Sequence, residues 1–295
     1  MSHAAVPSGL LVVDKPAGLT SHDVVARVRR LAGTRRVGHA GTLDPMATGV
    51  LVLGVERATR LLGHLALTDK AYDATIRLGV RTATDDAQGE VTAVAPAGHL
   101  DAEHVEEALR AFVGHIQQVP SAVSAIKVAG RRAYSRVRAG ESVELAARPV
   151  TVHAMSVSAV RRSGEAIDVD VAIVCSSGTY VRALARDAGD VLGVGGHLTM
   201  LRRTRVGPYD AAAARTLEQL AGSLELVPLE AAAAASFPSW SVDAVEAGAV
   251  AHGAQLAWPQ FLSRDEPAAI FGPDGTFLAL AQHRAGRAKL LAVFV

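Results

Sequence analysis

The clearest structural signal in the chain is the alternation of apolar and polar positions at residues 166–175. Every odd position from Ile167 onward is apolar, whereas Asp168 and Asp170 lie on the opposite face. This alternation predicts a half-buried β-strand. Shorter apolar runs predict further strands at residues 10–13 and 74–80, a buried strand or a short helix at residues 50–55, and short strands at residues 268–277, 278–283 and 290–295.

Helical periodicity is marked by capping residues. Thr20 and Asp23 have the spacing of a capping box, Val24 and Val28 share the apolar face that follows, and Gly33 is placed to end the helix. Further helices are predicted at residues 101–113, with Asp101 as the cap, at residues 180–192, and across the Ala-rich residues 211–235.

Composition narrows the class of protein. The chain has 295 residues, of which 49% are hydrophobic, enough for one large and one small domain. We expect a domain at residues 1–235 and a small β-rich domain at residues 236–295. A single cysteine excludes an internal disulfide and a cysteine-based zinc site. Without a secretory signal or an apolar run of the ~18 residues that a membrane helix needs, we expect a cytoplasmic protein.

A net charge of +1 conceals an uneven distribution of basic residues. Three clusters, at residues 27–36, 127–138 and 202–205, are rich in Arg and Lys. Each could be a solvated face, but together they indicate a surface for the phosphate backbone of a nucleic acid. Residues 120–149 carry the second cluster and are expected to leave the main sheet as an exposed insertion. The candidate RNA contacts are Lys127, Arg131, Arg132, Arg136, Arg202 and Arg203.

Local chemistry alone leaves two candidate residues ambiguous. Asp44 lies in a Gly-rich segment in which Pro45 favours extended backbone, so that a carboxylate can be held in one pose. An Asp-Pro pair is also a common start of a helix. Local chemistry therefore favours Asp44 as a structural helix cap over Asp44 as a catalytic group. Arg182 falls in the first turn of a predicted helix, where the helix dipole opposes a cation. A buried carboxylate could offset that, or the side chain could be solvated.

Several segments in order along the chain resemble the TruB family of tRNA pseudouridine(55) synthases. The segment GHAGTLDPMATG at residues 38–49 resembles the family's catalytic motif. The others are VDKPAGLTS at residues 13–21, KAY at residues 70–72, PSAVSAIK at residues 120–127, CSSGTYVR at residues 175–182 and LRR at residues 201–203. Together they span roughly residues 10–210.

The resemblance implies a fold and a set of roles. The fold is a mixed α+β domain around a bent, mainly antiparallel sheet with flanking helices, followed by a small PUA-like RNA-binding domain. The implied activity is isomerisation of the position-55 uridine in the T loop of tRNA, by base flipping and re-formation of the glycosidic bond at C5. Asp44 matches the catalytic carboxylate, Tyr72 the residue that stacks on the base and takes the C5 proton, and Arg182 the partner of Asp44. Residues matching the uridine pocket are His39, Tyr180 and Leu201.

The reaction imports no group and oxidises nothing, so we expect no cofactor and no metal. The partner is the T arm of tRNA, and we expect a monomer. Asp44 could add to C6, attack C1′ or abstract the 2′ proton. Two other functions stay open: an RNA binder or tRNA folding factor that does not need Asp44, and a nucleoside glycosidase. The glycosidase would need a second carboxylate, for which Asp85, Asp86 and Glu90 are candidates.

Overall fold

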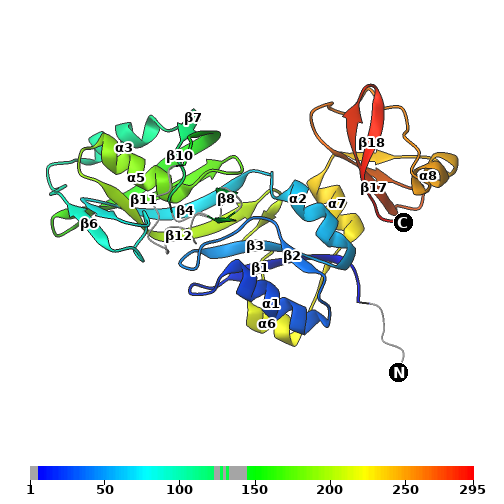
Figure 1. The fold of residues 1–295 in the computed structure, drawn as a ribbon, viewed down its shortest axis with the longest axis horizontal. Helices are drawn as coiled ribbons and strands as arrows, with labels where there is room; N and C mark the ends of the chain where they lie inside the picture. The colour runs from blue at the N-terminus through cyan, green and yellow to red at the C-terminus, as the bar shows by residue number, and fades with distance from the viewer. Residues whose placement is uncertain (1–5, 123–126, 129–130, 133–144) are drawn as a thin grey trace.

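The computed structural model describes residues 6–122, 127–128, 131–132 and 145–295. In these residues a ten-stranded sheet is flanked by helices, and a four-stranded sheet follows (Figure 1). The α+β class predicted from the sequence is confirmed. The large sheet contains β1 (Gly9–Lys15), β2 (Val37–His39), β3 (Thr48–Val55), β4 (Lys70–Leu78), β7 (Gly114–Gln118), β10 (Arg148–Ser163), β11 (Ala166–Cys175), β12 (Gly196–Val206), β13 (Tyr209–Asp210) and β14 (Val227–Pro228). The helices are α1 (Ser21–Ala32), η1 (Glu56–Leu61), α2 (Leu62–Leu65), α3 (Ala102–Arg110), α5 (Val181–Val191), α6 (Leu217–Gly222), α7 (Leu229–Ser236) and α8 (Ala244–Ala251).

Two antiparallel halves of the large sheet meet at a short parallel junction. The strand order is β14-β1-β3-β12-β4-β11-β10-β7, and β3 and β12 are the parallel neighbours. They pair at two positions, Thr48 with Arg202 and Gly49 with Arg203. Residues 40–47 connect β2 to β3 and therefore lie where the two halves meet. The sheet is mainly antiparallel, as expected, and residues 50–55 belong to a strand rather than a helix.

Gly49 is required by this junction. Its φ is +97°, and an added Cβ would lie 2.2 Å from the carbonyl oxygen of Arg203. We expect Gly49→Ala to lower the free energy of unfolding by about 2–4 kcal/mol, from overpacking plus a disfavoured backbone angle. Gly248 in α8 is the matched control, since nothing lies within 4 Å of its added Cβ and Ala favours a helix by about 0.5–1 kcal/mol. Urea unfolding of both variants checks this, and equal stability of the two would contradict it.

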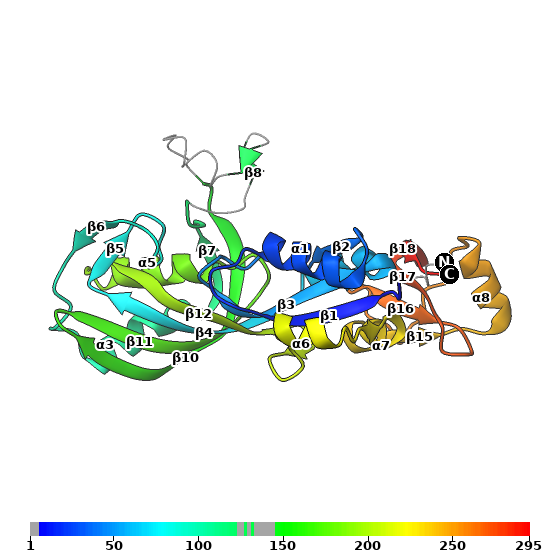
Figure 2. The same cartoon turned by 90° about the horizontal axis from the view of Figure 1, so that it is seen from below.

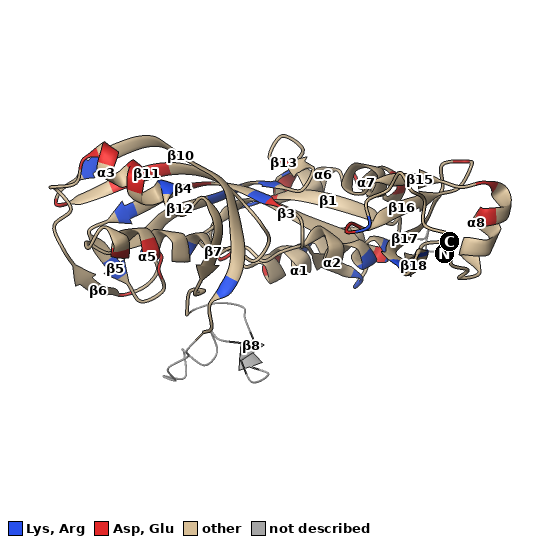
Figure 3. Ribbon diagram, turned by 90° about the horizontal axis from the view of Figure 1, so that it is seen from above, with Lys and Arg blue, Asp and Glu red and all other residues tan. Residues whose placement is uncertain are grey.

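Helix α1 forms as its sequence predicts. Thr20 and Asp23 make a reciprocal capping box, and Gly33 ends the helix in the left-handed conformation at φ 64°. Val24 and Val28 are fully buried in the core between the helix and the sheet, each contributing roughly 1.5–3 kcal/mol by burial. Helices α1, α2 and α5 lie on one side of the sheet (Figure 3).

The prediction that residues 211–235 are helical is confirmed only in part. The segment contains α6, β14 and α7. Thr216 starts α6 with its own capping box, and Ser223 ends it in extended backbone. Val227 then pairs with Leu10 of β1. Alanine favours a helix locally, but pairing with β1 interrupts it.

The four-stranded sheet contains β15 (Ser239–Ser241), β16 (Ala268–Phe271), β17 (Phe277–Arg284) and β18 (Arg287–Val293). This agrees with the β-rich character expected after residue 235. β16 begins at the predicted residue but ends at Phe271, β17 and β18 begin and end at other residues than predicted, and β15 was not predicted. Phe271, Phe277 and Phe294 share a buried cluster with Leu10 and Leu61 of the large sheet and η1. The C-terminal sheet is thus packed against the rest of the protein.

The predicted basic insertion leaves the large sheet between β7 and β10, whose residues Gln118 and Arg148 pair. Within it, β8 (Lys127–Val128) and β9 (Arg131–Arg132) form an antiparallel pair. Figure 2 shows β8 standing away from the layers of the sheet, on the side of α1 and α5. Arg136 lies outside the described residues, as do the side chains of Lys127, Arg131 and Arg132.

In the part of the chain that the structure describes, no helix is long and apolar enough to cross a membrane.

Candidate active site

Asp44 lies in an anchored loop and does not begin a helix, so the helix-cap interpretation is wrong. The loop, residues 40–47, has no helical residue. The hydroxyl of Ser21 donates to the carbonyl of Leu43 at 3.1 Å and accepts from its N–H at 2.9 Å. On the other side, the carbonyl of Pro45 accepts from the N–H of Gly18 at 2.7 Å. Because both neighbours of Asp44 are bonded to other segments, its backbone is fixed.

Arg203 also anchors this loop. Its side chain is 1% exposed and donates to the carbonyls of Val50 at 2.7 Å, Gly41 at 3.1 Å and Thr42 at 3.4 Å. The prediction that Arg203 contacts the RNA backbone conflicts with this burial. Because side chains alternate along β12, Arg203 points to the same buried face as Leu201. There the carbonyls of the loop and of Val50 accept its hydrogen bonds.

Arg202 faces the other way. Its guanidinium makes a two-point ion pair with Asp14, at 3.0 and 2.8 Å, and its side chain is about one third exposed. Basic and acidic residues lie near one another along these strands (Figure 3). Contact between Arg202 and RNA stays a prediction.

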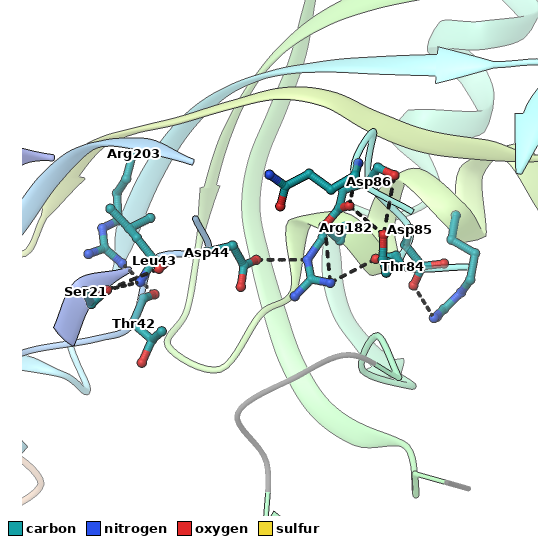
Figure 4. A network of polar contacts seen from close by, with 11 residues as sticks. Ser21, Thr42, Leu43, Asp44, Thr84, Asp85, Asp86, Arg182 and Arg203 are labelled. Atoms are coloured by element: carbon teal, nitrogen blue, oxygen red, sulfur yellow. Dashed lines mark hydrogen bonds and ion pairs between the residues drawn. The ribbon is translucent and has the colours of Figure 1, made fainter. Parts of the chain in front are cut away.

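Arg182 and Asp44 form the central ion pair. Nε of Arg182 lies 2.9 Å from Oδ2 of Asp44, and the arginine side chain is 4% exposed against 35% for the carboxylate (Figure 4). The solvated alternative for Arg182 is therefore wrong. Its position in the first turn of α5 would be unfavourable without such a partner.

A second carboxylate, which the sequence analysis did not place beside Arg182, lies behind it. Nη1 of Arg182 donates to the carbonyl of Thr84 at 2.9 Å and lies 3.6 Å from Oδ2 of Asp86. Asp86 is fixed in turn by the hydroxyl of Thr84 at 2.5 Å and the N–H of Gln88 at 3.0 Å. The acidic segment TDDAQGE at residues 84–90 is visible in the sequence, but the contact between Asp86 and an arginine 96 positions further along the chain is not.

Asp44 faces a cavity of about 250 Å³. Tyr72, Tyr180, Leu201 and Arg182 line it, so the structure brings these predicted residues together. Among the described residues that line it, Asp44 is the one carboxylate. Asp85 pairs with Arg186 and Asp86 lies behind Arg182, so neither supplies the second carboxylate of a glycosidase.

His39 is placed differently from the other predicted pocket residues. It ends β2 and is not among the residues that line the cavity. Its ring contacts that of His22 edge to face, with 5.5 Å between centroids. Its predicted role in the vacated base stack stays a prediction.

Two lysines that the sequence analysis did not assign to the site are buried beside it. Lys70 lines the cavity, and its Nζ donates to the carbonyls of Ala66 and Thr68 at 2.9 and 2.6 Å. Burial lowers the pKa of Lys70 to about 8, and the charge of Arg203 adds to this effect. Burial also lowers the pKa of Lys15 to about 8, although the negative charge of Asp44 acts in the opposite direction.

The described residues contain no group of three His, Cys, Asp or Glu placed to hold a metal ion.

Burial raises the pKa of Tyr72 above its ordinary value of 10, with the charge of Arg203 and a hydrogen bond to it opposing the shift. A phenol whose pKa is raised by folding is stabilising below its unfolded pKa and loses that contribution as pH rises through the folded value. We therefore expect Tyr72→Phe to remove one tyrosinate transition above pH 10 in an absorbance titration. The variant should also lose less stability above pH 10 than the wild type. An unchanged count of tyrosines titrating above pH 10 would contradict this.

Comparison with known proteins agrees with this geometry. The family model for the TruB pseudouridylate synthase N-terminal domain matches residues 29–181. Two models for the C-terminal parts of the tRNA pseudouridylate synthases match residues 182–233 and 237–295. A relative from Thermobifida fusca, called tRNA pseudouridine synthase B, is 59% identical over 290 residues, 97% of this chain and 98% of the relative. One from Streptomyces griseus with the same name is 56% identical over 98% and 97% of the two chains.

Solved structures share the fold. A chain of a Cbf5-Nop10-Gar1 complex superposes with a TM-score of 0.76 at 27% identity, over 97% of this chain and 85% of that one. A chain of an H/ACA RNP bound to a substrate RNA containing 2′-deoxyuridine gives 0.73 at 26% identity, with the same coverage. The family models, the named relatives and the shared fold identify the chain as a pseudouridine synthase. Within that class of isomerases, the chain belongs to the TruB family.

Proposed function

We propose that this enzyme isomerises the position-55 uridine in the T loop of tRNA, with Asp44 as the catalytic carboxylate. The observation that carries the proposal is the Asp44–Arg182 ion pair, 2.9 Å long, at a cavity that Tyr72 also lines. The names of relatives such as the one from Thermobifida fusca support tRNA as the RNA class.

Asp44 has the exposure and the support that the first step needs. Arg182 engages Oδ2, while 35% of the Asp44 side chain stays accessible from the cavity side. An ionised carboxylate held in a fixed pose is a nucleophile or a base, and both anchored neighbours preserve that pose. Addition to C6, attack on C1′ and abstraction of the 2′ proton each begin with a carboxylate that faces the cavity.

Tyr72 supplies an aromatic face for the flipped uracil and a hydroxyl for proton transfer. Its pKa is raised by burial, so the phenol is neutral at pH 7. Tyr72 can take the C5 proton only after releasing its own proton to solvent, and the charge of Arg203 and the hydrogen bond from it favour the tyrosinate that this requires. Arg203 thus serves two functions, because it also anchors the Asp44 loop.

We further propose that residues 120–149 contact the T arm and that residues 236–295 form a PUA-like RNA-binding domain. The β8–β9 pair carries Lys127, Arg131 and Arg132 on the side of the sheet where α5 lies (Figure 2). The proposed boundary falls at the last residue of α7, Ser236. A monomeric state, a cytoplasmic location and a reaction without metal or cofactor stay predictions.

The test uses purified protein and a T-arm hairpin RNA with the position-55 uridine present or replaced by cytidine. We expect pseudouridine at that position and none in the cytidine RNA, as mapped by carbodiimide labelling and primer extension. Pseudouridine at other uridines at an equal rate would contradict the position. Release of free uracil would instead indicate a glycosidase.

A further inference from the structure

The helix that carries Arg182 begins without a cap of its own. Tyr180 is the N-cap residue of α5, and its side chain makes no capping hydrogen bond. A remote side chain caps it instead: Oε1 of Gln118 accepts from the N–H of Tyr180 at 2.8 Å, and Nε2 donates to its carbonyl at 3.1 Å. Gln118 is 1% exposed and ends β7. One amide thus binds both backbone polar groups of a residue 62 positions away.

We propose that Gln118 is a positioning residue for the catalytic ion pair, an inference that rests on the role proposed above for Asp44 and Arg182. Tyr180 lines the cavity, and Arg182 follows it by two residues in a helix whose first bond runs from Leu184 N–H to the Tyr180 carbonyl. A shift of the Tyr180 backbone therefore moves the cavity wall and the guanidinium together.

A second contact joins the same two segments. Nη2 of Arg186 donates to the carbonyl of Val119 at 2.7 Å, while Nη1 lies 3.2 Å from Oδ2 of Asp85. Arg186 follows Arg182 by one helical turn, so both arginines lie on one face of α5. The first two turns of α5 are thus attached at two points to residues 118 and 119.

Gln118 and Val119 lie where the chain leaves β7 to enter the basic insertion. Gln118 pairs with Arg148, the first residue of β10, and the chain between them forms the insertion. The helix bearing Arg182 is therefore hydrogen-bonded to the place where the insertion leaves the sheet. Gln118 is buried and cannot contact RNA directly. Its loss should therefore change the rate of the chemical step more than the affinity for RNA.

The experiment compares Gln118→Met with Gln117→Ala, an exposed residue of the same type on the same strand. Pseudouridine formation is followed in single-turnover reactions on T-arm RNA, and RNA affinity by filter binding. We expect Gln118→Met to slow the reaction by roughly 10–100-fold, as sub-ångström to 1 Å misplacement does, with affinity within about twofold of wild type. Gln117→Ala should match wild type in both.

A double-mutant cycle shows whether Gln118 acts through Arg182. Combined with Arg182→Lys, the Gln118→Met change should slow the reaction much less than it does alone. If Gln118→Met does not fold, Gln118→Glu replaces it, since this variant keeps the acceptor for Tyr180 N–H and loses the donor, and we expect a smaller loss.

Two results would overturn the inference: a wild-type rate in a folded Gln118 variant, or losses at Gln118 and Arg182 that simply multiply. Failure of the proposed function is a distinct outcome, because the wild-type protein would then form no pseudouridine in this RNA.

Discussion

Replacing Asp44 with Asn is expected to abolish tritium release from T-arm RNA labelled at uridine C5. Asn is nearly isosteric but can act neither as a nucleophile nor as a base, and removal of such a group costs about 10⁴-fold or more in rate. The anchors of the loop involve Leu43, Pro45 and Arg203, not the Asp44 side chain. Arg182 also keeps its contacts with Asp86 and the Thr84 carbonyl, so the variant should still fold.

RNA binding is the control for Asp44→Asn. Affinity for the T arm should largely survive, because phosphate contacts by Arg and Lys supply most of the binding free energy. Tritium release at the wild-type rate would remove Asp44 from the chemistry. Full function of the variant in cells would instead favour an RNA binder or folding factor.

Loss of Arg182 is expected to affect both activity and stability. Arg182→Met leaves Asp86, whose side chain is 7% exposed, without its arginine. Removing one partner of a buried ion pair typically costs about 3–5 kcal/mol. Arg182→Lys keeps the charge, but a single ammonium cannot reproduce the fork that contacts Asp44 and the Thr84 carbonyl, and we expect a loss of about 10²–10³-fold in rate.

Arg77→Lys is the matched control for Arg182→Lys. Arg77 makes a two-point ion pair with Asp168 on β4 and β11, is partly exposed and is not among the cavity-lining residues. A pair of this exposure contributes about 0–1 kcal/mol, so urea unfolding and single-turnover rates should both stay near wild type. An Arg182→Lys variant as active as Arg77→Lys would contradict the role of the guanidinium.

Elements with complete local signals were predictable from the sequence. Helix α1 has its capping box, its apolar face and its terminal Gly33 within 14 residues, and β11 alternates over its whole length. The helical prediction for residues 211–235 is interrupted at β14, because helix propensity is weak where strand pairing competes, here between Val227 and Leu10.

Local sequence patterns predicted less of the active site than of the helices and strands. The composition around Asp44 favoured a helix cap, and the resemblance to a family outweighed it. The burial of Arg182 follows from tertiary packing of the segments around Asp44, Asp86 and α5, which no local pattern encodes. Arg203 did carry a signal, since alternation along β12 places it on the face of Leu201 and opposite Arg202.

The most direct test of the account is a map of pseudouridine in total tRNA from cells that lack this protein and carry either the wild-type chain or Asp44→Asn at equal levels. We expect the position-55 pseudouridine to disappear without the protein, to return with the wild-type chain and not to return with Asp44→Asn. Normal pseudouridine at position 55 with Asp44→Asn would contradict it.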